Sequence, residues 1–281
     1  MVNEGERYLL TAIYAAIEAG RAILEVYGTD FTVDHKPDDS PLTLADRNAH
    51  AIISMRLSPL NIPILSEEGK KIPSSERRPW ERLWIVDPLD GTKDFIKRNG
   101  EFTVNIALVE KEAPVMGVIY VPVRDTLYFA RQGLGSWKMS EAAGLLNPDK
   151  PAGSIGAVME HSRKLPLDHL SNEVFIIIGS RSHPTPDMEA FVREMQAKHP
   201  RVEFISAGSS LKFCRVGEGK AHVYPRFGPT MEWDTAAGQA IAENAGLSVL
   251  DFDTGLSLRY NKENLLNPRF IVKKQAIGDR G

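Results

Sequence analysis

The chain has 281 residues, of which 42% are hydrophobic and 25% are charged, and its formal net charge is −3 at pH 7. This composition is that of an ordinary soluble globular protein, and the length suits one large domain or two smaller ones. The small net charge excludes a general attraction to nucleic acid polymers or anionic membranes, so an anionic ligand needs a local site. The single cysteine, Cys214, excludes an internal disulfide and is expected to be a buried, inert thiol.

No targeting segment is evident at the amino terminus. The first residues are mixed in charge, and Glu18 and Arg21 interrupt the apolar stretch that follows them. No apolar run approaches the roughly 20 residues that cross a bilayer. We therefore expect a cytoplasmic protein without a transmembrane segment.

The first half of the chain predicts two helices packed against a sheet. Apolar residues at helical spacing predict a helix over residues 8–27, and a second over residues 43–57 with Thr43 as N-cap and Asp46 in its first turn. Residues 70–79 are polar and predict a loop. Short runs rich in β-branched and aromatic residues predict strands at residues 62–65, 83–86, 103–109, 115–121 and 126–130. This half is expected to form an antiparallel-leaning sheet.

A stretch rich in Pro, Gly, Asp and Ser at residues 144–156 predicts a boundary between two subdomains, 1–150 and 151–281. Beyond it, predicted strands alternate with predicted helices, and this alternation favours a mostly parallel sheet. The strands are expected at residues 174–179, 202–206 and 221–224, and the helices at residues 187–198, 209–216 and 235–245. The fold class is therefore α/β, with α+β layering.

Two aspartates after an apolar strand give the strongest chemical signal. The strand at residues 83–86 should deliver Asp87 to its carboxyl end, where open α/β sheets bind ligands, and Pro88 should end the strand. Asp90 lies three residues further on, close enough to share a cation, and Gly91 allows the backbone to approach an anion at a helix start. The alternative is that Asp87 merely ends a strand and Asp90 caps a helix.

Two further acids favour the metal interpretation. Glu67 follows a predicted strand, and Asp234 stands at the head of a helix in the second half; surface exposure and helix capping are their ordinary alternatives. Mg²⁺ takes oxygen ligands from several segments, with one or two carboxylates for each ion. These four acids would supply two ions that share Asp87, about 4 Å apart, which suits in-line phosphoryl displacement by water.

Three motifs lie along the chain in this order: Ser-Glu-Glu-Gly at 66–69, Asp-Pro-Leu-Asp-Gly-Thr at 87–92 and Trp-Asp-Thr-Ala-Ala-Gly at 233–238. Together they resemble the inositol monophosphatase superfamily of lithium-sensitive, magnesium-dependent phosphatases. Within that superfamily, four more stretches resemble the bacterial 3′(2′),5′-bisphosphate nucleotidases, at residues 90–103, 179–184, 208–214 and 224–230. The likeness runs from about Ser40 to Asn267 and implies an αβαβα sandwich, with the metal site in residues 1–150 and substrate-binding residues in 151–281.

The resemblance implies a set of metal ligands. Glu67, Asp87 and the carbonyl of Leu89 would bind one Mg²⁺, and Asp87, Asp90 and Asp234 would bind the second. A third, weaker ion near Glu67 is an alternative within the superfamily.

The resemblance also implies how water is activated. Asp46 and Thr92 would orient the attacking water, with Glu67 counted among the catalytic residues, and the backbone N–H groups of Gly91 and Thr92 would hold the scissile phosphate. No protein nucleophile is needed.

Substrate choice depends on a second phosphate and a base. Lys212 and Arg226 are candidates for the 5′-phosphate, with Ser209 and Ser210 as hydrogen-bond donors. His183 could contact the nucleoside, although it equally fits a helix entry; Arg181 and Lys36 are expected to be surface charges. The full set of predicted substrate-binding residues is Glu67, Leu89, Asp90, Gly91, Thr92, His183, Ser209, Ser210, Lys212, Arg226 and Asp234.

The activity that the resemblance implies is Mg²⁺-dependent hydrolysis of adenosine 3′,5′-bisphosphate to AMP and phosphate, a step that accompanies sulfate assimilation. One alternative is an inositol- or sugar-phosphate monoesterase of the same superfamily, and another is a catalytically silent nucleotide-binding sensor. The sequence leaves open a homodimer and peripheral attachment to the cytoplasmic face of the inner membrane.

Overall fold

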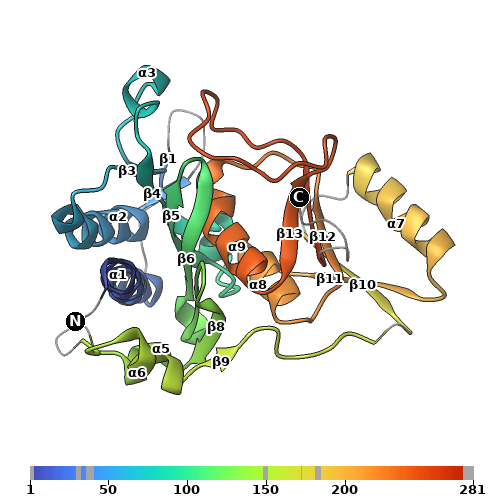
Figure 1. Cartoon of the computed structure of the whole chain (residues 1–281), viewed down its shortest axis with the longest axis horizontal. Helices are drawn as coiled ribbons and strands as arrows, with labels where there is room; N and C mark the ends of the chain where they lie inside the picture. Colours follow the sequence, from blue (N-terminus) through green and yellow to red (C-terminus); the bar gives the residue numbers. More distant parts are fainter. Residues whose placement is uncertain are drawn as a thin grey trace.

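The computed structural model describes residues 3–29, 33–35, 41–147, 151–171, 173–180 and 185–274. Its elements form five layers in the order helices, sheet, helices, sheet, helix (Figure 1). The helical layers are α1 (Glu4–Tyr27) with α2 (Leu44–Leu57), then α8 (Leu211–Gly217) with α9 (Glu232–Asn244), and finally α7 (Pro186–Lys198). The predicted αβαβα sandwich is confirmed.

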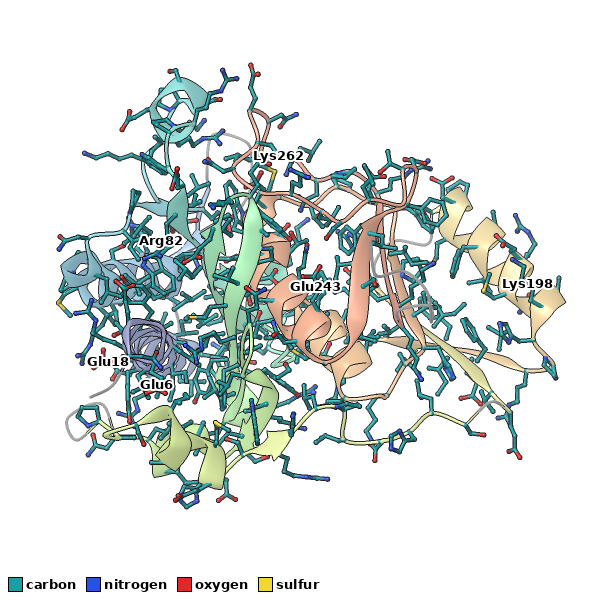
Figure 2. The ribbon with its side chains drawn as sticks, in the orientation of Figure 1. Glu6, Glu18, Arg82, Lys198, Glu243 and Lys262 are labelled. Atoms are coloured by element: carbon teal, nitrogen blue, oxygen red, sulfur yellow. The ribbon has the colours of Figure 1, made fainter. Side chains whose placement is uncertain are left out.

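The outer helices α1 and α2 begin where the local chemistry favours a helix start. The side chain of Asn3 accepts a hydrogen bond from the backbone N–H of Glu6 at 2.9 Å, so α1 begins four residues before the predicted position. Helix α2 starts at Leu44, directly after Thr43, and Asp46 lies in its first turn as expected. Glu18 of α1, labelled in Figure 2, forms an ion pair with Arg56 of α2.

Within the described ranges, the first sheet has seven strands in the order β3-β4-β5-β6-β7-β8-β9. Only β3 and β4 pair in parallel among these strands, which confirms the antiparallel-leaning prediction. The strands are β3 (Ile64–Ser66), β4 (Arg82–Asp90), β5 (Thr103–Glu110), β6 (Ala113–Val121), β7 (Thr126–Arg131), β8 (Gly135–Ser140) and β9 (Arg163–Lys164).

Several short elements of the first half were not predicted. Strands β8 and β9 extend the sheet beyond the predicted set, and a short helix, α3 (Ser74–Arg77), lies within the expected loop. Two more helices, α5 (Ala142–Leu145) and α6 (Ile155–Glu160), flank the predicted boundary, and β1 (Val33–His35) pairs with β2 (Pro41–Thr43). Because β9 follows residue 150 and still joins the first sheet, the subdomain division stays a prediction.

Both faces of the first sheet are buried. Val104, Ile106 and Leu108 of β5 belong to the core shared with α1 and α2, whereas Ala107 and Val109 belong to the core shared with α9. Alternation therefore sends successive apolar side chains to two different cores. This explains why β5 reads as a continuous apolar run.

The second sheet has the order β11-β10-β12-β14-β13. Strand β10 (Phe175–Gly179) pairs in parallel with β11 (Val202–Ser206) and β12 (Val223–Arg226), as the alternating pattern predicted. Strand β14 (Phe270–Lys274) pairs antiparallel with β12 and with β13 (Leu247–Asp251). These last two strands were not predicted, and they make the sheet mixed.

The two sheets are separated by α8 and α9 (Figure 1). Figure 2 shows Glu243 on α9 within this central layer, while Lys198 on α7 lies on the opposite side of the molecule from Glu6 and Glu18 on α1. No helix in the described ranges is both long enough and apolar enough to cross a membrane.

Helix α9 packs very closely against β6 at Gly117. A Cβ atom at Gly117 would lie 2.4 Å from the carbonyl oxygen of Ala237 and 2.9 Å from the Cβ of Ala240. The first neighbour is backbone, so it cannot rotate away. The absence of a side chain at Gly117 therefore lets α9 approach the sheet.

We expect Gly117→Ala to lower the free energy of unfolding by about 1–3 kcal/mol, because the methyl group overpacks the contact with α9. Urea unfolding followed by circular dichroism measures this change. Gly144→Ala is the matched control, since Gly144 lies in α5 with open space around its Cβ position and alanine favours a helix. An equal stability for the Gly117→Ala protein and the unsubstituted protein would contradict the close packing.

Candidate active site

Strand β4 does not end at Pro88 but continues to Asp90. The prediction that Pro88 stops the strand is therefore wrong. Asp87 pairs with Asn105 of β5 and Asp90 pairs with Thr103, so β4 has one more residue than β5 between these two pairs. This is a β-bulge, a place where a residue without an N–H is tolerated in a sheet.

Three of the predicted metal ligands come together at this bulge. Asp87, Asp90 and Asp234 each offer a carboxylate oxygen, and these oxygens lie within 4.8 Å of one another. The first two side chains belong to β4, and the third belongs to the first turn of α9. Elements from the two halves of the sequence thus build one acidic cluster.

Repulsion and burial act together on this cluster. Burial raises the pKa of Asp87 well above its usual value, and the neighbouring charges of Glu67, Asp90 and Asp234 raise it further. Burial, with Asp90 as the next cause, raises the pKa of Asp234 to about 8. A divalent cation would relieve this repulsion, and oxygen donors from separate segments are what Mg²⁺ binds. The residues present therefore fit the metal that the sequence predicts.

Each carboxylate is also fixed by the backbone. Asp234 accepts a hydrogen bond from the N–H of Met231 at 2.8 Å, which caps α9, and Asp87 accepts one from the N–H of Leu89 at 3.1 Å. Each contact uses one carboxylate oxygen. Capping and metal binding, which the sequence posed as alternatives for Asp234, are therefore compatible.

The carboxylate of Asp90 accepts more of these hydrogen bonds than that of Asp87 or Asp234. Its Oδ2 accepts hydrogen bonds from the hydroxyl of Ser209 at 2.5 Å, the N–H of Ser210 at 2.7 Å and the amide of Asn105 at 3.3 Å. The hydroxyl of Thr103 lies 2.7 Å from that of Ser209 and 2.8 Å from that of Ser210. The network joins β4, β5 and the segment before α8.

Sequence reasoning missed Thr103 and Asn105. Both are buried polar residues within a strand whose other residues are mostly apolar. Buried polar groups need partners, so polar residues at alternate positions of an apolar strand were the available signal.

A cavity of about 470 Å³ opens beside the cluster. Eight of the predicted residues line it: Glu67, Asp90, Gly91, Thr92, Ser209, Lys212, Arg226 and Asp234. The other eight lining residues were not predicted as site residues: Lys93, Asp94, Lys97, Ser180, Phe213, Tyr224, Thr230 and Thr235. Among the described residues, the predicted Asp46, Asp87, Leu89 and Ser210 are outside this lining.

The remaining predicted residues have different positions. Asp46 is buried in the first turn of α2, and Glu67 is exposed just after β3, outside the tight group of three carboxylates. His183, Arg181 and Lys36 lie outside the described residues. Cys214 is buried, and burial raises its pKa well above the usual value, as expected of an inert thiol.

Gly91 and Thr92 form the turn from β4 into α4 (Thr92–Ile96). Gly91 has a φ of 92°, in the left-handed region that favours glycine, which explains the residue type at this turn. The hydroxyl of Thr92 donates to the carbonyl of Leu89 at 3.4 Å. The predicted helix start after Gly91 is confirmed.

Two cations lie on the same cavity wall as Tyr224. Lys212 is buried, and its Nζ donates to the carbonyls of Ser209 at 2.5 Å and Ala207 at 3.2 Å. Burial lowers the pKa of Lys212 to about 8, while Asp90 opposes that change. Arg226 donates from Nη2 to the carbonyl of Pro229, and its Nε is buried without a hydrogen-bond partner. The cavity thus joins an acidic cluster to a pair of cations.

Residues 5–279 match the inositol monophosphatase family, and the chain belongs to this family. It is a phosphatase, and hence a hydrolase. The chain is 44% identical over 263 residues to the 3′(2′),5′-bisphosphate nucleotidase CysQ of Salmonella typhimurium, covering 92% of this chain and 96% of that protein. The same nucleotidase of Escherichia coli is 43% identical over the same length and coverage.

Solved structures agree with this assignment. The crystal structure of CysQ from Bacteroides thetaiotaomicron has a TM-score of 0.89 and 52% identity, covering 96% of this chain and 98% of that one. An inositol monophosphatase from Anabaena has a TM-score of 0.70 and 24% identity, covering 97% of this chain and 92% of that one, and supports the fold alone.

We expect Mg²⁺ affinity to rise with pH between about 6 and 8. In the metal-free protein the raised pKa of Asp234, about 8, keeps this group largely protonated at neutral pH, so the metal must displace a proton. Each displaced proton gives up to about a tenfold change in affinity for each pH unit, and Asp87, whose pKa is also raised, can add to the change. Isothermal titration calorimetry with MgCl₂, in buffers of different ionisation enthalpy, measures both the affinity and the proton release.

The same pKa shift sets the sign of a stability change. The pKa of Asp234 in the folded protein lies above its ordinary value of 3.8, so the folded state binds a proton more tightly than the unfolded state. The free energy of unfolding of the metal-free protein should therefore fall as the pH rises from about 3.8 to about 8. Glu243→Gln is the matched control for the Mg²⁺ titration, because burial also raises the pKa of Glu243 on the same helix, outside the metal cluster. It should leave the pH dependence of the Mg²⁺ affinity unchanged. A Mg²⁺ affinity that is constant from pH 6 to 8 would rule out this linkage.

Proposed function

We propose that the chain is a Mg²⁺-dependent 3′(2′),5′-bisphosphate nucleotidase that converts adenosine 3′,5′-bisphosphate into AMP and phosphate. The observation that carries this proposal is one cavity lined by Asp90 and Asp234 and also by Lys212 and Arg226. The acids suit a metal that binds the reacting phosphate, and the cations suit a second phosphate on the same molecule. The nucleotidase names of the relatives support the same substrate class.

The ligands in this proposal are five groups from three segments. Asp87, Asp90 and Asp234 would hold Mg²⁺ together with Glu67 and the carbonyl of Leu89, and we infer two ions with Asp87 shared between them. The chemistry that Mg²⁺ supplies when bound is a lowered pKa for water and neutralisation of charge on phosphate oxygens. A third ion near Glu67 stays a prediction.

The chain itself orients the reacting groups. Thr92 lines the same cavity as Asp90 and Asp234 and donates to the carbonyl of Leu89, which supports the proposal that its hydroxyl accepts a hydrogen bond from the attacking water. In the proposal the carbonyl of Leu89 turns to the metal, and the Thr92 hydroxyl donates to the carboxylate of Asp46 in place of that carbonyl. The N–H groups of Gly91 and Thr92 bind the scissile phosphate at the start of α4.

The second phosphate is assigned to Lys212 and Arg226. Both have donors in the cavity wall, and the Nε of Arg226 has no partner within the protein. Ser209 and Ser210 remain candidates for phosphate contacts, although their hydroxyls already bind Asp90, Thr103 and Asn105. A contact between His183 and the nucleoside stays a prediction.

An inositol- or sugar-phosphate monoesterase is the second candidate. The metal cluster and Thr92 suit either substrate, and the fold is shared with inositol monophosphatases. A substrate with one phosphate gives Lys212 and Arg226 no partner, which favours the nucleotidase. A silent sensor fits less well, because it has no use for a carboxylate cluster that suits a divalent cation.

We expect Thr92→Ala to lower kcat far more than it changes KM, since a hydroxyl that orients water acts mainly in the transition state. Steady-state phosphate release at saturating Mg²⁺ measures both constants. Thr92→Ser keeps the hydroxyl and should retain most of kcat. Asp46→Asn should behave like Thr92→Ala, and the double variant should be no worse than either alone because both act on one water. A change confined to KM would reassign Thr92 to substrate binding.

The substrate assignment is tested by the second phosphate. Lys212→Met and Arg226→Met should each weaken transition-state binding of adenosine 3′,5′-bisphosphate by about 1.5–3 kcal/mol, the range for hydrogen bonds to charged groups. Hydrolysis of inositol 1-phosphate should hardly change, because it has no second phosphate. The measurement is kcat/KM for both substrates.

Lys97→Met is the matched control, because Lys97 lines the same cavity but is not assigned to the second phosphate. It should affect the two substrates equally and weakly. If the unsubstituted enzyme hydrolyses inositol 1-phosphate as efficiently as the bisphosphate, or if both variants lose the two activities in parallel, the monoesterase replaces the nucleotidase.

A further inference from the structure

Residues 207–210, between β11 and α8, contact both functional parts of the candidate active site. On one side, the hydroxyl of Ser209 and the N–H of Ser210 hold the carboxylate of Asp90. On the other side, the carbonyls of Ala207 and Ser209 accept the hydrogen bonds of Lys212. The position of this short segment therefore sets a proposed metal ligand and a proposed phosphate ligand together.

This segment has a backbone conformation that needs external support. Ser209 has a φ of 53°, in the left-handed region, which is unfavourable for a residue with a side chain. Such conformations persist where surrounding contacts determine them, and they occur often at functional sites. The contacts around Gly208 and Ser209 are therefore the ones that decide where the segment lies.

Glu101 contacts this segment from 107 residues earlier in the chain. Its Oε2 accepts a hydrogen bond from the N–H of Gly208 at 2.8 Å, and its Oε1 accepts one from Nη2 of Arg124 at 3.0 Å. The side chain of Glu101 is 12% exposed, whereas that of Arg124 is 39% exposed. The bond to Gly208 is therefore well shielded from water, and Arg124 holds the carboxylate from the outer side.

Gly208 fits tightly against Asp94 and against the Cβ and carbonyl oxygen of Glu101. A Cβ atom there would lie 2.8 Å from Oδ2 of Asp94 and 2.9 Å from the Cβ of Glu101. Glycine thus lets the backbone reach Glu101 closely enough for its N–H to donate. The N–H of Glu101 in turn donates to the side chain of Asn99 at 3.0 Å, which fixes the loop that carries it.

We propose that Glu101 is a positioning residue that holds residues 207–210 and thereby prepares Asp90 for the metal and Lys212 for the non-reacting phosphate of the substrate. The carboxylate of Glu101 holds the N–H of Gly208. The next two residues then contact Asp90 through the Ser209 hydroxyl and the Ser210 N–H, and the carbonyl of Ser209 contacts Lys212. The part that concerns the second phosphate rests on the proposed function. The part that concerns Asp90 applies to any metal-dependent phosphatase reaction at this site.

Glu101→Gln tests this role with an almost isosteric side chain. An amide has one acceptor oxygen, so it cannot accept from both Gly208 and Arg124, and its NH₂ group faces a donor. We expect affinities for Mg²⁺ alone and for AMP alone to fall about tenfold each, the size of effect for losing one hydrogen bond to a charged group. Isothermal titration calorimetry measures both, at a temperature well below the unfolding transition of every variant.

Two further variants separate positioning from a structural role. Glu110→Gln is the matched control, because Glu110 pairs with Arg82 at 2.9 Å at the far end of β5 and leaves residues 207–210 untouched. It should change neither affinity. Arg124→Gln removes the outer partner but keeps the bond from Gly208 to Glu101, so its loss of Mg²⁺ and AMP affinity should be smaller than that of Glu101→Gln. It also serves as the test if Glu101→Gln does not fold.

The outcomes are distinct. A fall in both affinities in Glu101→Gln, with Glu110→Gln unchanged, supports the proposal. Unchanged Mg²⁺ affinity overturns it whatever the substrate is, and so does a lower melting temperature with both affinities intact. If the unsubstituted protein binds Mg²⁺ but not AMP, the proposed function fails, and the Mg²⁺ measurement still decides whether Glu101 positions Asp90.

Discussion

Asp87, Asp90 and Asp234 hold carboxylate oxygens within 4.8 Å of one another, where burial and mutual repulsion oppose ionisation of Asp87 and Asp234. No short segment can create such a cluster, because its members come from β4 and α9, in different halves of the sequence. The first sheet must therefore pack against α9 before the cluster exists. Gly117 contributes directly, since a backbone without a side chain lets α9 lie close to β6. The packing of the sandwich is thus the condition for the chemistry.

Several residues serve the fold and the site at once. The carboxylate of Asp234 caps α9 through the N–H of Met231 and still offers an oxygen to a cation. The bulge at Asp87–Asp90 interrupts regular pairing with β5 and accommodates Pro88 while it brings both aspartates into the cluster. Bulges often occur beside active sites, where they redirect a side chain. A local irregularity of the sheet is therefore part of how the ligands are placed.

Local patterns in the sequence predicted the regular elements and the individual acids well. Residues 202–206 form β11 as predicted, because a short segment with β-branched and aromatic residues can be recognised without knowledge of its distant partners. Contacts between residues far apart in the sequence could not be predicted from local patterns. Asn105 and Thr103 support Asp90 across a sheet and a loop, and Glu101 bonds to Gly208 at a separation of 107 residues. The strand that continues through Pro88 was missed for a related reason, since the bulge exists only in the pairing with β5.

The electrostatics of the cavity show what its ligands must supply. Burial raises the pKa of Asp234 to about 8 and lowers that of Lys212 to about 8, so both groups are moved toward their neutral forms in the free protein. A cation beside Asp234 and a phosphate beside Lys212 would each restore the charged form. An acid and a base with shifted pKa values in one cavity are typical of functional sites, where a bound ligand stabilises the charged forms of both groups. A metal ion and a doubly phosphorylated substrate together satisfy both ends of this cavity, whereas a substrate with one phosphate satisfies only the acidic end.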